Sequence, residues 1–174
     1  MGQVAAIATP WAKAWDHAAV CVNMDRILEV EGIEEEHVRR RLTAHAIVAS
    51  GWRQNVHAFN VWKVKLGKAA MDYYVGDTVE EKDGATYTEK GTKWRAYDSF
   101  GAALSDHPVF SMSRYAAAKV ALLDAARPDG DYWKELGKAG YYTDTMNIHP
   151  PDFASICHRV ATETANAAPF KKKS

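Results

Sequence analysis

The stretch LTAHAIVASGW, residues 42–52, decides how the rest of the chain is interpreted. It continues a row of positions at steps of four, three and four residues, the spacing of one helix face: Val38, Leu42, His45 and Ala49. Three glutamates starting at Glu34 are favourable at the positive end of a helix dipole, and Gly51 is typical of a residue that ends a helix. We therefore expect a helix whose last turn presents residue 49, where the side chain is only a methyl group.

The composition is that of one globular domain. Of the 174 residues, 47% are hydrophobic and 25% are charged, which argues against disorder. Lys plus Arg and Asp plus Glu both number 22, so net charge gives no reason to expect nucleic acid as a partner. The basic end Lys171–Lys173 is interpreted as a solvated terminus.

The cysteines and the first residues of the chain give expectations about disulfide bonds and export. Cys21 and Cys157 lie far apart without metal-site spacing, and a disulfide framework would need more cysteines. The first residues lack a basic segment and Pro10 interrupts their apolar run, so we expect no signal peptide. No stretch has the length of a membrane span. The expectation is a protein made in the cytoplasm that does not use the usual export signal.

Hydrophobic periodicity predicts a mostly helical protein with one β insert, the α+β class. Helices are expected over residues 11–30, 34–51, 99–107, 113–126, 132–140 and 151–165. Residues 71–97 are rich in β-branched and aromatic residues and are interrupted at Gly76, Asp83-Gly84 and Gly91, which predicts a small antiparallel lobe with a hairpin at residues 81–85. Asp98-Ser99 is interpreted as a helix N-cap pair.

Six sequence motifs follow one another in a characteristic order. They are LTAHAIVASGW (42–52), HAFNVWKVK (57–65), TVEE (78–81), KWRAYDSFGAALSDH (93–107), SRYAAA (113–118) and LGKAGYYTD (136–144). In this order they resemble the glucosaminidase family of peptidoglycan hydrolases, which includes autolysins and the muramidase-like domain of flagellar rod assembly proteins. The resemblance covers roughly residues 38–160. It implies a lysozyme-like α+β fold with a glycan groove between the helices and the β-lobe.

The resemblance also implies a reaction, cleavage of β-1,4 bonds between N-acetylglucosamine and N-acetylmuramic acid. The family motif reads like A-Q-A-x-x-E-S-G-W, with the glutamate as general acid, and it falls on residues 44–52. Here Ala49 occupies the glutamate position and His45 occupies the glutamine position. Because the leaving sugar oxygen needs a proton from a carboxylic acid of raised pKa, a methyl group cannot replace that acid.

Other residues are considered for the missing role. His45 is one turn from Ala49, and the Cβ atoms of such a pair are about 5–6 Å apart. The imidazole would therefore be poorly placed to deliver a proton where the glutamate would. The alternative interpretation of His45 is a groove or core histidine. Glu34–Glu36 are several turns away and are interpreted as helix-start charges. The family's second carboxylate corresponds to Glu80, with Glu81 as the alternative register and a solvated hairpin charge as the competing interpretation.

Several aromatic positions are candidate glycan contacts, since the six tryptophans and eight tyrosines suit a core and also a sugar groove. With His45, the candidate substrate-binding residues are Trp52, Phe59, Tyr97, Tyr115 and Tyr141, each with ordinary packing as the alternative. Asn60 stands where the family has glycine, which would leave the backbone less free to approach a ligand. His149 has no evident partner, and no metal or cofactor is expected.

The sequence therefore leaves several functional hypotheses. In the first, a domain at 34–168 is a disabled relative that binds glycan strands or serves in a phage tail or baseplate, with 1–33 as a helical docking extension and 169–174 as a basic tail. In the second, the chain is a working hydrolase whose glutamate was replaced by engineering at Ala49. In the third, activity persists through His45 or a displaced carboxylate. An unrelated helical domain with accidental motifs is the remaining interpretation.

Overall fold

The computed structural model describes residues 2–3, 16–51, 57–82, 85–142 and 150–167, although not the side chains of residues 80–82. Its elements are α1 (His17–Val30), α2 (Glu36–Ser50), β1 (Tyr73–Lys82), β2 (Ala85–Arg95), α3 (Phe100–Ser105), α4 (Pro108–Ser111), the 3-10 helix η2 (Ser113–Tyr115), α5 (Ala116–Leu123), α6 (Asp129–Lys138) and α7 (Pro150–Asn166). This is the expected α+β class, mostly helical with a small antiparallel sheet. Within the described ranges, no helix has the length and hydrophobicity to cross a membrane.

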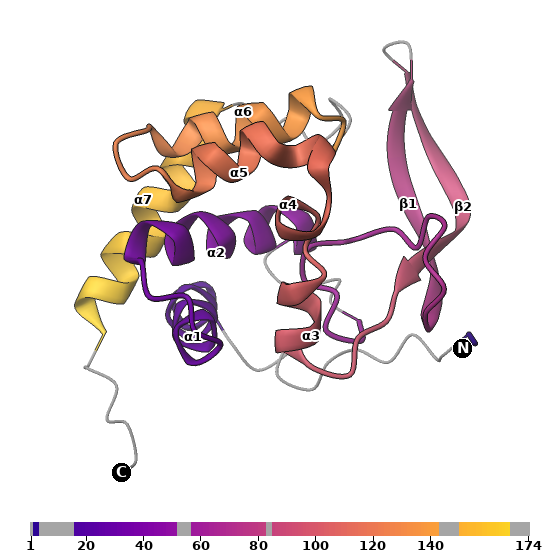
Figure 1. The fold of residues 1–174 in the computed structure, drawn as a ribbon, viewed down its shortest axis with the longest axis horizontal. Helices are drawn as coiled ribbons and strands as arrows, with labels where there is room; N and C mark the ends of the chain where they lie inside the picture. Colours follow the sequence, from indigo (N-terminus) through magenta and orange to yellow (C-terminus); the bar gives the residue numbers. More distant parts are fainter. Residues whose placement is uncertain (1, 4–15, 52–56, 83–84, 143–149, 168–174) are drawn as a thin grey trace.

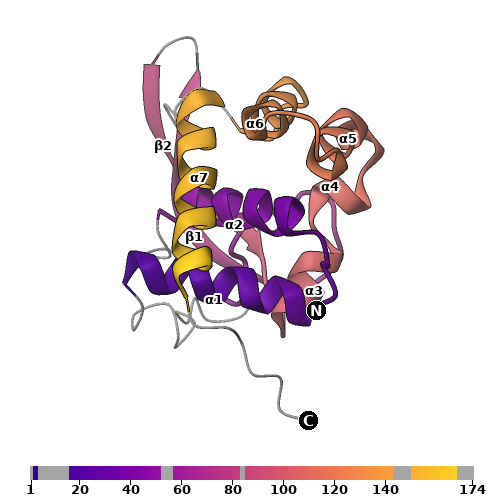
Figure 2. The same cartoon turned by 90° about the vertical axis from the view of Figure 1, so that its left-hand side faces the viewer.

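Helix α2 is central to the helical part of the molecule. It contacts α1, α5, α6 and α7, and Figures 1 and 2 show it lying between these helices with its C-terminal end directed toward the hairpin. Its face toward the core is fully buried at Val38 and Leu42, as the spacing predicted. The expected end at Gly51 is also confirmed, because Gly51 adopts the left-handed conformation with φ of 58°.

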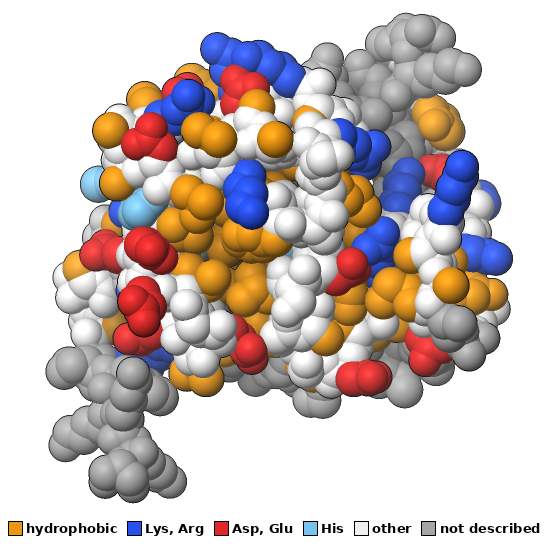
Figure 3. All heavy atoms as spheres, viewed as in Figure 1, with side chains coloured by type: hydrophobic (Ala, Val, Ile, Leu, Met, Phe, Trp, Pro, Cys, Tyr) orange, Lys and Arg blue, Asp and Glu red, His pale blue; other side chains and the backbone are white. Residues whose placement is uncertain are grey.

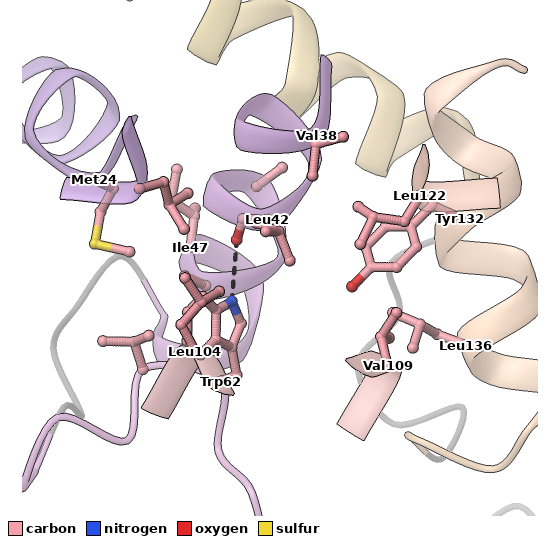
Figure 4. Packing of buried hydrophobic residues seen from close by; sticks show 14 of the residues in the cluster. Met24, Val38, Leu42, Ile47, Trp62, Leu104, Val109, Leu122, Tyr132 and Leu136 are labelled. Atoms are coloured by element: carbon pink, nitrogen blue, oxygen red, sulfur yellow. Dashed lines mark hydrogen bonds between the residues drawn. The ribbon is translucent and has the colours of Figure 1, made fainter. Parts of the chain in front are cut away.

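Large aromatic side chains fill the core around α2. Trp62, from the segment before the hairpin, is 1% exposed and donates its indole N–H to the carbonyl of Leu42 at 3.1 Å (Figure 4). A buried tryptophan needs such a partner for its N–H group. This contact holds the segment that enters the hairpin against the middle of α2.

The buried face of α1 does not follow from helical spacing alone. Val22 and Ile27 lie near helical spacing in the sequence, yet both are only partly buried, and Ile27 packs against the core from that position. The fully buried apolar residues are instead Val20, Cys21, Met24 and Leu28. The reason is tertiary, since α1 packs against both α2 and α7 and its buried face is set by both neighbours. Trp11 and Trp15 lie outside the described residues, and Cys21 and Cys157 are buried free thiols.

The two strands form the predicted hairpin, but they are longer and more continuous than expected. They pair antiparallel from Tyr73 opposite Arg95 to Lys82 opposite Ala85. The expected interruption at Gly76 is only a register shift, and Gly91 lies within β2 at φ of 68°. A bulge admits a glycine of positive φ without ending the pairing. The hairpin therefore extends as one long ribbon beside the helices (Figure 1).

Helix α5 is shorter than the single helix predicted over residues 113–126. Residues 113–115 form a 3-10 turn, and α5 ends at Leu123. The end has a physical cause, because the carbonyls of Ala121 and Leu122 accept hydrogen bonds from the Arg41 side chain. A cationic donor at these last carbonyls caps a helix. The predicted N-cap of α3 is confirmed, since Ser99 Oγ accepts from the N–H of Ala102 at 3.1 Å.

Arg41 of α2 is the most highly connected buried polar group in the described part of the fold. Its side chain is 1% exposed. Nε donates to the carboxylate of Asp129 at 2.7 Å, Nη1 donates to the carbonyl of Asp124 as well as the two carbonyls that end α5, and Nη2 donates to the carbonyl of Arg127. The planar guanidinium thus joins α2 to α5, to the turn after it and to the start of α6.

We expect Arg41→Lys to lower the free energy of unfolding by about 3 kcal/mol or more, because an ammonium offers fewer donors and leaves buried carbonyls unpaired. Arg40→Lys is the matched control. Arg40 binds the same Asp129 but is partly exposed, so we expect a loss of only about 1 kcal/mol or less. Urea denaturation of both variants is the measurement, and equal losses would contradict the proposed importance of the Arg41 contacts.

Candidate functional site

A cavity of about 980 Å³ lies between the helices and the hairpin. Its walls come from four parts of the chain: the end of α2, the segment 57–68, the facing residues of β1 and β2, and the region from α4 to the turn after α6. This volume is at the large end of the range of about 300–1,000 Å³ found for small-molecule sites. The cavity is therefore large enough for an extended ligand.

Ala49 lines this cavity from the last turn of α2. The helix ends directly after it, because the N–H of Gly51 bonds to the carbonyls of Ile47 and Val48 while Ser50 Oγ bonds to the carbonyl of Ala46 at 2.6 Å. The left-handed Gly51 then turns the chain away. The last turn of α2 thus places a partly buried methyl group at the cavity wall.

His45 lies one turn earlier and is fully buried at the cavity wall. The N–H of Val109 donates to Nδ1 of His107, so neutral His107 carries its proton on Nε2 and directs it at His45 Nδ1, 3.3 Å away. We assign the Tyr132 hydroxyl as a second donor to the same nitrogen, at 2.9 Å. The proton of neutral His45 is then on Nε2, which has no hydrogen-bond partner among the described residues.

The two histidines are uncharged at neutral pH. Burial lowers the pKa of His107 to about 3, and burial together with His107 lowers the pKa of His45 well below its ordinary value. Desolvation penalises an imidazolium, so the folded protein holds both rings neutral. His45 can therefore donate a neutral hydrogen bond but has no acidic proton to supply.

Two of the predicted tyrosines lie on the cavity wall. Tyr141 donates its hydroxyl to the carbonyl of Trp62 at 2.7 Å, and its ring packs edge-on against Tyr115 with centroids 5.6 Å apart. Tyr115 is 1% exposed and its ring lies under the guanidinium of Arg114, 4.6 Å from the ring centroid. These contacts fix the orientation of the rings that a ligand would meet.

The remaining predicted contacts are placed differently. Tyr97 and Phe59 are not among the residues that line the cavity. Tyr97 donates its hydroxyl to Asp106 at 2.7 Å, and Phe59 packs against the core with its backbone at φ of 55°. Trp52 lies outside the described residues. Glu80 lies in β1 opposite Tyr87, and its side chain is outside the described part of the structure.

The structure adds cavity residues that the sequence did not single out. Tyr74 and Trp94 line the hairpin side, and Trp133 and Tyr142 stack on each other at 4.3 Å on the helical side. Five cationic residues also line it, namely Lys63, Lys65, Lys68, Arg95 and Arg114. Residues 74–79 of β1 all belong to the lining, and the register shift between Gly76 and Thr78 breaks the alternation of faces, so strand periodicity could not have identified them. No local signal marks Lys63. In Figure 3, Lys and Arg side chains gather over the hairpin side of the molecule.

Carboxylates are scarce in the same lining. Asp77 is the single acidic residue among the described lining residues, and it is held by Lys90 and by the N–H of Gly91. These bonds lower the pKa of Asp77, so its carboxylate stays ionised. Within the described ranges, no group of three or more His, Cys, Asp or Glu side chains is arranged to hold a metal ion.

Comparisons with known proteins identify the fold. No family model and no curated protein matches the chain. A solved structure of a peptidoglycan hydrolase mutant from Sphingomonas sp. A1 is similar, with a TM-score of 0.64, 18% identity, and coverage of 87% of this chain and 98% of that chain. The peptidoglycan hydrolase from the same organism aligns with a TM-score of 0.61 and 18% identity over 90% of this chain and 100% of that chain.

A C-terminally truncated glycoside hydrolase domain of FlgJ from Salmonella typhimurium is also similar. It has a TM-score of 0.52 and 25% identity, and the alignment covers 84% of this chain and 97% of that chain. The chain therefore has the lysozyme-like fold of these hydrolases, as its motifs led us to expect. At these identities the likeness shows the fold and leaves the activity to the site itself.

Lys63 gives a test of the electrostatics of this cavity. Burial lowers its pKa from 10.5 to about 8, because the ammonium is half-buried with no carboxylate within 4 Å among the described residues. At pH 7 the Lys63 amine is charged in both the folded and the unfolded protein, and burial disfavours this charge only in the folded protein. As pH rises from about 8 to 10.5, the folded protein releases this proton first, so the wild-type protein gains stability in that window.

We therefore expect Lys63→Met to raise the free energy of unfolding at pH 7 by about 1–2 kcal/mol, since it removes a desolvated charge. The advantage should shrink as pH rises through the window above. Lys134→Met, on the exposed side of α6, is the matched control for replacing a lysine by methionine outside the cavity. Urea denaturation at pH 7 and pH 10 is the measurement, and a destabilised Lys63→Met at pH 7 would contradict this interpretation.

Proposed function

We propose that this protein binds the glycan strands of bacterial peptidoglycan in the cavity between the helices and the hairpin, without cleaving them. The observation that carries the proposal is Ala49, whose methyl group occupies the last turn of α2 at the cavity wall. The likeness of the fold to peptidoglycan hydrolases supports the choice of ligand. The place of action would be the bacterial wall, or a phage particle that meets it.

The chemistry of the cavity argues against hydrolysis. A glycosidase needs a group that is protonated at working pH and can release its proton to the leaving oxygen. Among the described lining residues, Asp77 is kept ionised by its partners and His45 is kept neutral by burial. Burial raises the pKa of Tyr115 and of Tyr141, which makes their hydroxyls still weaker acids. None of these four residues is therefore suited to act as general acid.

Several residues of the cavity wall support the binding of a glycan. Ring faces of Trp94, Tyr141 and Tyr142 belong to the cavity wall, and aromatic faces stack on the C–H faces of pyranose rings. The Nε2–H of His45 is a buried donor without a partner, available if a small shift opens it to a sugar acceptor or a bridging water. Glycan recognition needs only such donors and surfaces, whereas cleavage also needs the acid that Ala49 lacks.

The position of Ala49 would suit a general acid if one were restored. The C-terminal end of a helix carries partial negative charge, which disfavours an ionised carboxylate and raises its pKa. Partial burial acts in the same direction. Glu80 on β1 is proposed as the second carboxylate of such a restored site.

We expect the wild-type protein to release no reducing ends from purified peptidoglycan, and Ala49→Glu to release them about 10²–10⁴-fold faster than the background, the usual contribution of general acid catalysis. Ala49→Gln is the matched control, because it has nearly the same shape without an acidic proton and should stay inactive. Reducing-end release is the measurement. Activity of the unaltered chain would overturn the proposal of binding without cleavage.

Binding is tested separately by co-sedimentation of the wild-type protein with insoluble peptidoglycan. We expect it to sediment with the glycan, and Tyr141→Ala to reduce the bound fraction because it removes a ring from the cavity wall. A comparable tyrosine outside the cavity, Tyr87 on the exposed side of β2, provides the control. A wild-type protein that stays in the supernatant would contradict the proposed function.

A further inference from the structure

The charges around the cavity are unbalanced. Two of its five cations have carboxylate partners, since Lys65 binds Glu89 at 2.9 Å and Arg95 binds Asp106. The other three, Lys63, Lys68 and Arg114, have no carboxylate within 4 Å in the described part of the chain. The single acidic residue of the described lining, Asp77, is already engaged by Lys90. The described lining therefore carries excess positive charge, although the whole chain has as many acidic as basic residues.

Lys63 differs from the other two unpaired cations in its surroundings. Lys68 and Arg114 are exposed and keep most of their hydration, whereas Lys63 is half-buried. Its Nζ lies 5.4 Å from the ring centroid of Trp94, and its backbone is held at φ of 54°, a conformation that non-glycine residues rarely adopt. The half-burial of the charge and the positive φ both cost stability in the free protein, whereas the contact with Trp94 offsets part of that cost. Such costs concentrate at functional sites, where a ligand can offset them.

We propose that Lys63 is the anion-recognition residue of the cavity and that it selects glycans whose sugars carry a carboxylate. The proposal rests on the proposed function and narrows its ligand. In peptidoglycan this group is the lactyl carboxylate of an N-acetylmuramic acid that carries no stem peptide, and neutral polymers of N-acetylglucosamine lack it. Lys68 and Arg114, at the exposed part of the lining, add attraction at longer range.

The strength of the interaction follows from partial desolvation. A charge pair in a partly water-excluded site is screened less than one on the surface, and a hydrogen bond between two ions is stronger than one between neutral groups. Because Lys63 has already lost part of its hydration in the free protein, a carboxylate meets a cation that is poorly satisfied. Trp94, which also lines the cavity, lies beside the ammonium.

The experiment compares three soluble ligands by isothermal titration calorimetry. They are a tetrasaccharide of alternating N-acetylglucosamine and N-acetylmuramic acid, the same tetrasaccharide with its carboxylates methyl-esterified, and the neutral tetramer of N-acetylglucosamine. We expect the wild-type protein to bind the free acid about tenfold more tightly than the ester, as one charge-assisted hydrogen bond would give. Lys63→Met should abolish this preference and bind all three ligands alike.

The controls separate this inference from the proposed function. Lys134→Met removes one exposed charge outside the cavity and should keep the tenfold preference. Unchanged affinity of Lys63→Met for the neutral tetramer reports that its cavity is still folded. If the wild-type protein binds acid and ester equally, or if Lys63→Met weakens both equally, carboxylate recognition by Lys63 is wrong while glycan binding stands. If the wild-type protein binds none of the three ligands, the proposed function itself fails.

Discussion

The buried guanidinium of Arg41 is the interaction on which the rest of the structure depends. It ends α5 by taking the carbonyls of Ala121 and Leu122, and it holds the start of α6 through Asp129. A buried charge is tolerated only when its donors are satisfied, so α5 and the start of α6 must meet at one place on α2. With α2 fixed in this way, its C-terminal turn, and with it Ala49, is directed to the cavity beside the hairpin.

The cavity that results combines features of a binding site with a described lining that holds no carboxylic acid of raised pKa. Burial keeps the His45–His107 pair neutral, and ion pairing keeps Asp77 ionised, so neither can protonate a leaving oxygen. Its cations outnumber its carboxylates, and one of them, Lys63, is held where water is partly excluded. Such a charge lowers the stability of the free protein. These features support the proposal of a protein that recognises a glycan and leaves its bonds intact.

Some features of the structure could be predicted from the local sequence and others could not. The helix that ends at Gly51, the N-cap at Ser99 and the hairpin beyond residue 71 follow from local rules, and all are present in the structure. Asn60 shows the limit. Its replacement of glycine suggested a less adaptable backbone, but its amide bonds to the carbonyls of Val64 and Arg95, both at 2.9 Å, and ties the loop to β2. Tyr97 likewise lies behind the cavity wall, because Asp106 binds its hydroxyl there.

The sequence by itself determined the α+β class, the end of α2 and the methyl group at position 49, because periodicity, capping and residue identity are local properties. The tertiary structure alone decided which face of α1 is buried, where α5 ends and which cations surround the cavity. Each of these depends on partners far along the chain, such as the 80 residues between Arg41 and Ala121. The Lys63 ammonium becomes half-buried only when residues from distant segments pack around the cavity, so no local sequence pattern could have identified it.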